Sequence, residues 1–133
     1  MADLKKREEI LAYVDQLITA TVSGTMMWRV VNPTTFLWST SSPQQARITL
    51  QRVDRKVPGT AVVNGRSVNV LKQDRQFVFQ AFDNFAPNSS PVVSWDSGED
   101  VDLNTRLAAL FEAIGTAITQ KSLDFLQSIL PKT

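Results

Sequence analysis

The residues with the clearest chemical potential are basic side chains in the middle of the chain. Residues 47–75 contain seven basic and two acidic side chains, which gives this segment a net charge of +5. The basic residues are Arg47, Arg52, Arg55, Lys56, Arg66, Lys72 and Arg75. Such side chains neutralise phosphate groups, so the segment is a candidate polyanion-binding site.

Two other interpretations of this basic segment stay open. Sequence-tolerant binding of single strands usually adds aromatic side chains that stack on bases, and residues 47–75 contain no aromatic residue. The segment could instead be a solvated sheet edge, where basic residues discourage unwanted strand pairing. It could also pair with residues 76–133, which hold three basic and seven acidic side chains, net −4. That pairing could lie within one chain or run head to tail between copies, because the whole chain has a net charge of only +1.

Acidic side chains gather in "WDSGEDVD", residues 95–102. Clustered carboxylate oxygens suit Ca²⁺ or Mg²⁺, although the spacing matches no EF-hand loop. Carboxylates are also favoured at the first turn of a helix, where they meet exposed N–H groups. We expect Asp100 or Asp102 to cap a helix, and we predict no metal and no other cofactor.

The side chains that the sequence lacks restrict its chemistry. There is no cysteine and no histidine, so thiol nucleophiles, thiolate or imidazole metal sites and Ser-His arrangements are excluded. Hydroxyl groups occur at residues 39–42 and 122–124, but no Ser-Lys motif accompanies them. We therefore predict that the protein is not an enzyme.

The location of the protein is predicted from two further absences. The start of the chain, "MADLKKREEI", lacks the apolar core of a signal peptide. No segment has the apolar length that is needed to span a bilayer. We expect a cytoplasmic protein without a membrane partner.

The elements that position these residues begin with a helix. Apolar residues at 4, 10, 11, 14, 17 and 18 recur at helical spacing, with Asp3 as the expected N-cap and Gly24 as the terminator. Strands are predicted at 26–31, 34–38 and 46–53. Their connections are too short for crossovers, so an antiparallel meander is expected.

A basic hairpin is predicted as an insertion at about residues 55–72. Asn64-Gly65 is typical of a two-residue type I′ turn. That turn places Val63 opposite Arg66 and gives a ribbon over residues 57–71 with one shallow apolar face. We expect this ribbon to be mobile, with a hinge at Pro58-Gly59.

The strongest strand is "RQFVFQAFDNF", residues 75–85, which is apolar on both faces. We expect Phe79 to lie in the core between the sheet and a terminal helix. A closing strand is predicted at 91–96. Two helices should follow, one from 103 to about 118 and one from an N-cap at Ser122 to a stop at Pro131.

The predicted fold class is α+β, with one α-β-α domain over residues 1–133. An N-terminal helix precedes an antiparallel sheet of about five strands with the extra basic hairpin. Two C-terminal helices then pack on the sheet, on the same face as the first helix.

Several patterns carry a resemblance: "W-x(3)-NPTTFLW", "ITLQRV", "FVFQAFD" and "LNTRLAALFEAI…SLDFLQSIL". Together they resemble a set of small uncharacterised bacterial α+β proteins, to which no activity is attached. The resemblance covers most of the chain except the hairpin and implies a bacterial source. The segment "TRLAALFEAI" is also similar to the C-terminal helices of the coat proteins of small RNA phages, which open with a strand hairpin, whereas this chain opens with a helix.

The function predicted from these patterns is a cytosolic interaction or assembly module that binds copies of itself or another protein. The last predicted helix has apolar residues over about 160° of its circumference, more than one contact needs. We expect a homodimer with Phe125 and Ile129 at its interface. The alternative is a nucleic-acid-binding protein that uses the basic residues of segment 47–75.

Overall fold

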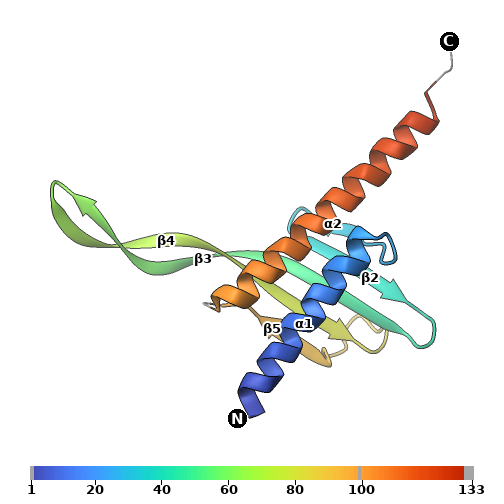
Figure 1. Ribbon diagram of the computed structural model, residues 1–133, viewed down its shortest axis with the longest axis horizontal. Helices are drawn as coiled ribbons and strands as arrows, with labels where there is room; N and C mark the ends of the chain where they lie inside the picture. The colour runs from blue at the N-terminus through green and yellow to red at the C-terminus, as the bar shows by residue number, and fades with distance from the viewer. Residues whose placement is uncertain (1, 99, 131–133) are drawn as a thin grey trace.

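The computed structural model describes residues 2–98 and 100–130, with side chains from residue 6 onward. Its elements are α1 (Ala2–Val22), β1 (Arg29–Asn32), β2 (Thr35–Thr40), β3 (Ala46–Val63), β4 (Arg66–Phe82), β5 (Val93–Asp96) and α2 (Val101–Ser128). The strands form one antiparallel sheet in the order β1-β2-β3-β4-β5 (Figure 1). The predicted α+β class, the five-stranded sheet and the N-terminal helix are therefore confirmed.

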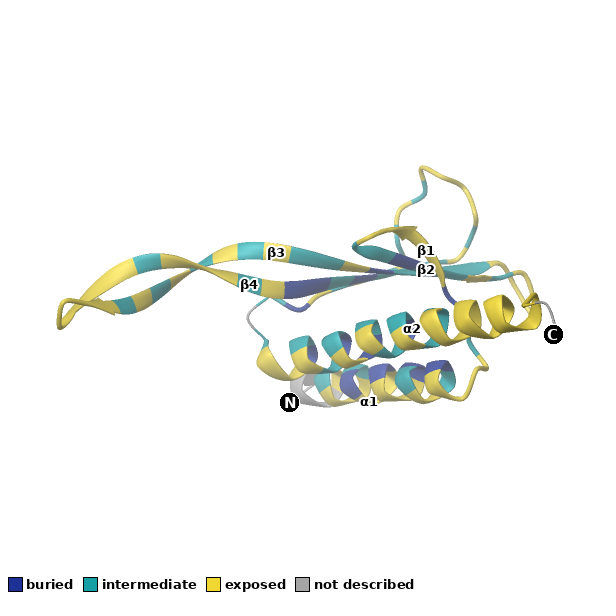
Figure 2. Ribbon diagram, turned by 90° about the horizontal axis from the view of Figure 1, so that it is seen from above, coloured by how far each residue is buried: buried dark blue, intermediate teal, exposed yellow. Residues whose placement is uncertain are grey.

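Both helices lie on the same face of the sheet (Figure 2). They run parallel, because Arg7 near the start of α1 contacts Asp100 before α2, and Asp15 further along α1 contacts Arg106. The core lies between this helix pair and one row of strand residues, which pairs Phe36 with Leu50, Leu50 with Phe79 and Phe79 with Trp95. Its buried apolar residues are Leu11, Val14, Leu17, Trp28, Phe36, Ile48, Leu50, Phe77, Phe79, Leu103, Leu107, Leu110 and Ile114.

The prediction for Phe79 is consistent with this packing. Phe79 is only 1% exposed and its ring stacks on Trp95 at a centroid distance of 4.9 Å. Phe77, two residues earlier on the same face, contacts the Phe111 ring of α2 at 5.5 Å. The strong apolar alternation of β4 thus places its aromatic residues against the helix layer.

The prediction of two C-terminal helices is wrong, because α2 is one uninterrupted helix. Ser122 does not cap a new helix; its hydroxyl donates to the Ile118 carbonyl oxygen at 3.0 Å, one turn earlier. Gly115 lies within the helix, where glycine costs only about 1 kcal/mol relative to alanine. The predicted stop at Pro131 lies outside the described residues.

Helix α2 begins at Val101, two residues before the predicted start, and one of the two predicted caps is confirmed. The Asp100 carboxylate accepts a hydrogen bond from the Leu103 backbone N–H at 3.2 Å, so Asp100 is the N-cap. In contrast, the predicted cap of the first helix is wrong, since α1 already begins at Ala2 and includes Asp3. Gly24 follows the end of α1 with a φ of +83°, as expected of a helix terminator.

The predicted hairpin is the outer part of two long strands, not an insertion between shorter ones. Pairing of β3 with β4 continues from Arg47–Phe82 to Val63–Arg66. Pro58 pairs with Leu71 and Gly59 with Val70 inside this ladder, so the ladder has no break at the predicted hinge. Asn64 (φ 52°) and Gly65 (φ 77°) form the turn with the predicted register.

Beyond the sheet, β3 and β4 pair only with each other. Strand β2 pairs with β3 up to Gln51, and β5 pairs with β4 from Val78. We call residues 53–63 and 66–76 the ribbon. It projects from one end of the molecule, whereas the C-terminal end of α2 projects in another direction (Figure 1).

Candidate self-association and polyanion-binding surfaces

Arg47 is held by contacts inside its own chain. Its guanidinium carbon lies 4.0 Å from the centre of the Phe82 ring. It also donates to the backbone oxygens of Asn84 and Ala86 and to the Ser89 hydroxyl, at 3.0–3.2 Å. These contacts fasten the loop between β4 and β5, so Arg47 has a structural role at this position.

Arg55 is also held internally, at the base of the ribbon. Its two terminal nitrogens donate to the two Asp96 carboxylate oxygens, each at 2.7 Å, and one of them also donates to Gln76 at 2.7 Å. Hydrogen bonds from Arg55 hold the pKa of Asp96 below its ordinary value, although partial burial opposes this shift. The pair connects β3 to β5 across the intervening strand.

Arg52 and Arg75 lie on either side of Asp54. Their Nε atoms are 4.0 and 3.9 Å from its carboxylate oxygens, distances too long for hydrogen bonds. Among the described side chains, the Arg52 Nε is a buried polar atom without a hydrogen-bond partner. The carboxylate of Asp54 therefore weakly compensates the positive charges of Arg52 and Arg75.

The remaining three, Lys56, Arg66 and Lys72, take no part in the ion pairs of the described residues. Residues 56–73 contain these three basic side chains and no acidic one, so the outer ribbon has a charge of +3. The ladder places Arg66 and Lys72 on one face and Lys56 on the other, because side chains alternate along a strand. The seven basic residues are thus spread over the sheet and the ribbon instead of converging on one site.

In the acidic run, residues 95–102, the carboxylates of Asp100 and Asp102 accept hydrogen bonds from Arg7 of the same chain. Arg7 donates to both Asp100 oxygens, at 2.8 and 3.1 Å, and to Asp102 at 3.0 Å. These bonds hold the pKa of Asp100 below its ordinary value, assisted by the Leu103 backbone N–H. Glu99 lies outside the described residues. In residues 2–98 and 100–130 no group of three or more histidine, cysteine or acidic side chains is placed to hold a metal ion.

The predicted interface residues lie on the exposed end of α2. We call residues 119–130 the arm, which extends beyond the end of α1 and past the sheet (Figure 1). Phe125 is 63% exposed and Ile129 is 60% exposed. Five large apolar side chains of the arm are exposed: Leu123, Phe125, Leu126, Ile129 and Leu130.

The arm continues the core-facing side of α2. Seven residues correspond to nearly two helical turns, so Phe125 lies on the same side as Phe111 and Ile118, which pack against the core. The stripe that faces the sheet therefore runs on after the sheet has ended. No described residue of the same chain covers it there.

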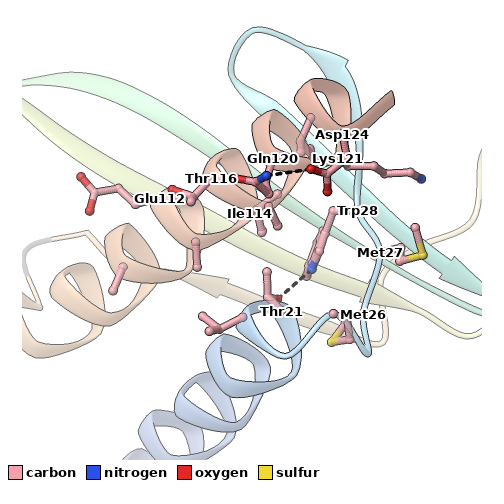
Figure 3. Close-up of a pocket in the computed structure, with 16 residues that line it drawn as sticks. Thr21, Met26, Met27, Trp28, Glu112, Ile114, Thr116, Gln120, Lys121 and Asp124 are labelled. Atoms are coloured by element: carbon pink, nitrogen blue, oxygen red, sulfur yellow. Dashed lines mark hydrogen bonds between the residues drawn. The ribbon is translucent and has the colours of Figure 1, made fainter. Parts of the chain in front are cut away.

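A groove that sequence reasoning missed lies along α2, next to the end of α1. It has a volume of about 680 Å³ and is bounded by the end of α1, residues 24–28 and the flank of α2 (Figure 3). Trp28 forms part of its wall and donates from Nε1 to the buried Thr21 hydroxyl at 3.0 Å. The remaining lining residues are Val22, Gly24, Met26, Met27, Ala109, Glu112, Ala113, Ile114, Thr116, Ala117, Ile118, Gln120, Lys121 and Asp124.

The groove exists because α1 ends before α2 does. Up to Val22, α1 covers this flank of α2, and beyond that point the flank is open. The available sequence signal was alanine at 109, 113 and 117, which places small side chains on one side of a helix at i, i+4 and i+8. Without the end of α1 located beside Ile114, that spacing could not be assigned to a groove.

Comparisons with family models, with curated proteins and with solved structures find no match for this chain. Of the described helices, none has the length and apolar character that crossing a membrane requires.

Proposed function

We propose that this protein is a non-enzymatic assembly module whose copies bind one another through the arm. The observation that carries this proposal is the exposure of the five large apolar side chains of the arm, which ranges from 49% to 64%. Large contiguous apolar patches are uncommon on the surfaces of soluble monomers and usually mark an interface. A cytoplasmic location fits this role.

The position of Phe125 and Ile129 favours a partner that lies beyond the end of the sheet and covers the arm as the sheet covers the rest of α2. Both residues extend the core-facing side of α2, so a second copy placed beyond the sheet would meet them as the sheet meets Phe111. A two-fold dimer is the default arrangement, because the same patch then serves both copies. Exposed ion pairs would add at most about 1 kcal/mol each, so apolar burial supplies most of the affinity.

The alternative function is polyanion binding by the outer ribbon. It is supported by the charge of +3 on residues 56–73 and by the lack of ion pairs to Lys56, Arg66 and Lys72 among the described residues. Binding of this kind weakens steeply as salt is raised. Titration of an arbitrary RNA at two salt concentrations tests it, and salt-independent or absent binding would exclude it.

Sedimentation equilibrium at micromolar concentrations tests self-association. We expect the native chain to exceed its monomer mass of 14.8 kDa and the double variant Phe125→Glu, Ile129→Glu to have a lower mean mass than the native chain while remaining folded. Phe85→Glu, Val92→Glu is the matched control, because it places two charges on exposed apolar residues outside the arm and should associate like the native chain. A native chain that is monomeric at every concentration would refute the proposal.

A further inference from the structure

We propose a second contact between copies, in which the ribbon of one copy binds in the groove of another. This inference rests on the proposed self-association and adds a different pair of surfaces to it. The contact is head to tail, because ribbon and groove are unlike surfaces of the same chain. Together with the arm contact it would carry assembly beyond a dimer.

Beyond its base, where Gln76 is buried and Arg55 contacts Asp96, the side chains of the ribbon are half-buried or exposed. A two-stranded hairpin alone is marginally stable in water, yet this one extends for eleven residue pairs, from Val53–Gln76 to Val63–Arg66. Its exposed apolar residues include Val63 at 52% and Val68 at 38% on one face, and Val62 at 75% and Leu71 at 68% on the other. A ribbon of this length and composition is expected to pack against a partner.

One face of the ribbon has the character that the groove requires. The cross-strand register places Val57, Ala61, Val63, Val68 and Val70 on one face. Arg66 and Lys72 are on the same face, near its two ends. The face is therefore a narrow aliphatic strip with a positive charge toward each end.

The groove offers the complementary arrangement. Apolar side chains that include Met26, Met27 and Ala117 line it, and Glu112 and Asp124 lie at separate points along α2 (Figure 3). Neither carboxylate forms an ion pair with another described residue. Lys121 also lines the groove, which leaves a net charge of −1 from these three groups.

The spacings of the two charge pairs agree. Arg66 and Lys72 are six residues apart on one strand, which corresponds to about 20 Å at about 3.3 Å per residue. Glu112 and Asp124 are twelve residues apart on one helix, which corresponds to about 18 Å at about 1.5 Å per residue. Glu112 and Asp124 are also about 120° apart around the axis of α2, so the agreement concerns the axial separation of the two charge pairs.

The arm is a less suitable occupant of the groove. At about 100° per residue, the apolar residues of the arm are centred roughly 180° from Ala113, Ala117 and Asp124 around the axis of α2. In a two-fold pair of antiparallel arms, each helix presents the same side to the other. The part of the groove that Ala113, Ala117 and Asp124 form is therefore turned away from the partner in that pair, which leaves it for a different segment.

Sedimentation velocity on four chains tests the proposal at low ionic strength. We expect native particles larger than a dimer. We expect the ribbon variant Arg66→Glu, Lys72→Glu and the groove variant Glu112→Lys, Asp124→Lys each to stop at twice 14.8 kDa, and an equimolar mixture of the two to grow beyond a dimer again. Lys56→Glu, Arg75→Glu makes the same charge change on the opposite ribbon face and should assemble like the native chain.

The outcomes separate this contact from the arm contact. A native chain and a ribbon variant that are both dimers would overturn the ribbon–groove contact and leave the proposed function standing, whereas a monomeric native chain would overturn both. If the control variant Lys56→Glu, Arg75→Glu also failed to form particles larger than a dimer, the ribbon–groove contact would be overturned, because the effect would then depend on total charge alone.

Disulfide formation gives an independent test, since the chain has no cysteine of its own. When Val63→Cys and Thr116→Cys are mixed and oxidised, we expect a disulfide-linked pair between the two variants. Absence of that pair would contradict the contact.

Discussion

The covered part of the sheet and the two extensions, ribbon and arm, are made of similar residues in different surroundings. Phe79 in the sheet is 1% exposed, whereas Phe125 in the arm is 63% exposed. Leu50 is fully buried in the core, whereas Leu71 on the ribbon is 68% exposed. The same strands and the same helix contribute to both regions, since β3, β4 and α2 each continue from the core into an extension.

This difference shows which part of the chain buries its apolar side chains without a partner. Under the helices, every apolar row has a partner row, and the stability of the monomer comes from there. In the extensions, the strands and the helix continue without a second layer packed on them. Their apolar side chains stay exposed to water, which is unfavourable unless a partner covers them. The molecule therefore has a small packed core and two extensions, the ribbon and the arm, whose apolar side chains are exposed.

A matched pair of phenylalanine substitutions gives the largest expected effect. Phe79→Ala removes a buried ring and should lower the free energy of unfolding by about 3–5 kcal/mol. Phe125→Ala, measured at a concentration where the chain is monomeric, should change it by less than about 0.5 kcal/mol. Urea denaturation followed by circular dichroism measures both, and equal losses in the two variants would remove the distinction between core and arm.

Two glycines should respond in opposite directions. Gly115→Ala adds a methyl group to α2 with no atom within 4 Å and should stabilise the protein by about 0.5–1 kcal/mol. Gly65→Ala forces alanine into a turn conformation with a φ of +77° and should weaken the ribbon by about 1–2 kcal/mol. Thermal denaturation tests the first change, and hydrogen exchange of the ribbon amides tests the second; stabilisation of the ribbon by Gly65→Ala would contradict the assigned turn.

A smaller, pH-dependent effect is expected at the base of the ribbon. Hydrogen bonds from Arg55 lower the pKa of Asp96 in the folded state, so this pair stabilises the protein above about pH 4 and the contribution is lost as the pH falls through the lowered pKa. In Asp96→Asn, the free energy of unfolding should fall less steeply between about pH 5 and about pH 2. Arg55→Gln should have the same effect, and an unchanged slope in both variants would show that the pair makes no net contribution.

The sequence predicted most of what local patterns determine. The Asn64-Gly65 turn and its register follow from residue type, and the alternation in β4 identifies the face that holds Phe79. The exposure of Phe125 and Ile129 agrees with the width of the apolar stripe on that helix. The single α2 could not be distinguished from two helices, because Gly115 and Ser122 are tolerated inside a helix as well as at its ends.

The parts that the sequence did not predict depend on contacts between distant segments. Arg47 was a candidate for binding polyanions, but the structure uses it to fasten a loop 37–42 residues further along the chain. Arg55 is likewise paired with Asp96, 41 residues away. The groove depends on where α1 ends relative to α2, which no pattern within either helix indicates.

The order of the elements has a consequence for the synthesis of the protein. All five strands pair with their sequence neighbours, so the sheet is complete once Asp96 has left the ribosome. Its inner face, however, is closed partly by α2, whose 28 residues follow Asp96 and leave the ribosome later. At about 5–20 residues per second, the growing chain spends roughly 1–6 s with Phe77 and Phe79 incompletely covered. A nascent chain of this protein should therefore be a good substrate for chaperones that bind apolar β-surfaces, until the last helix emerges.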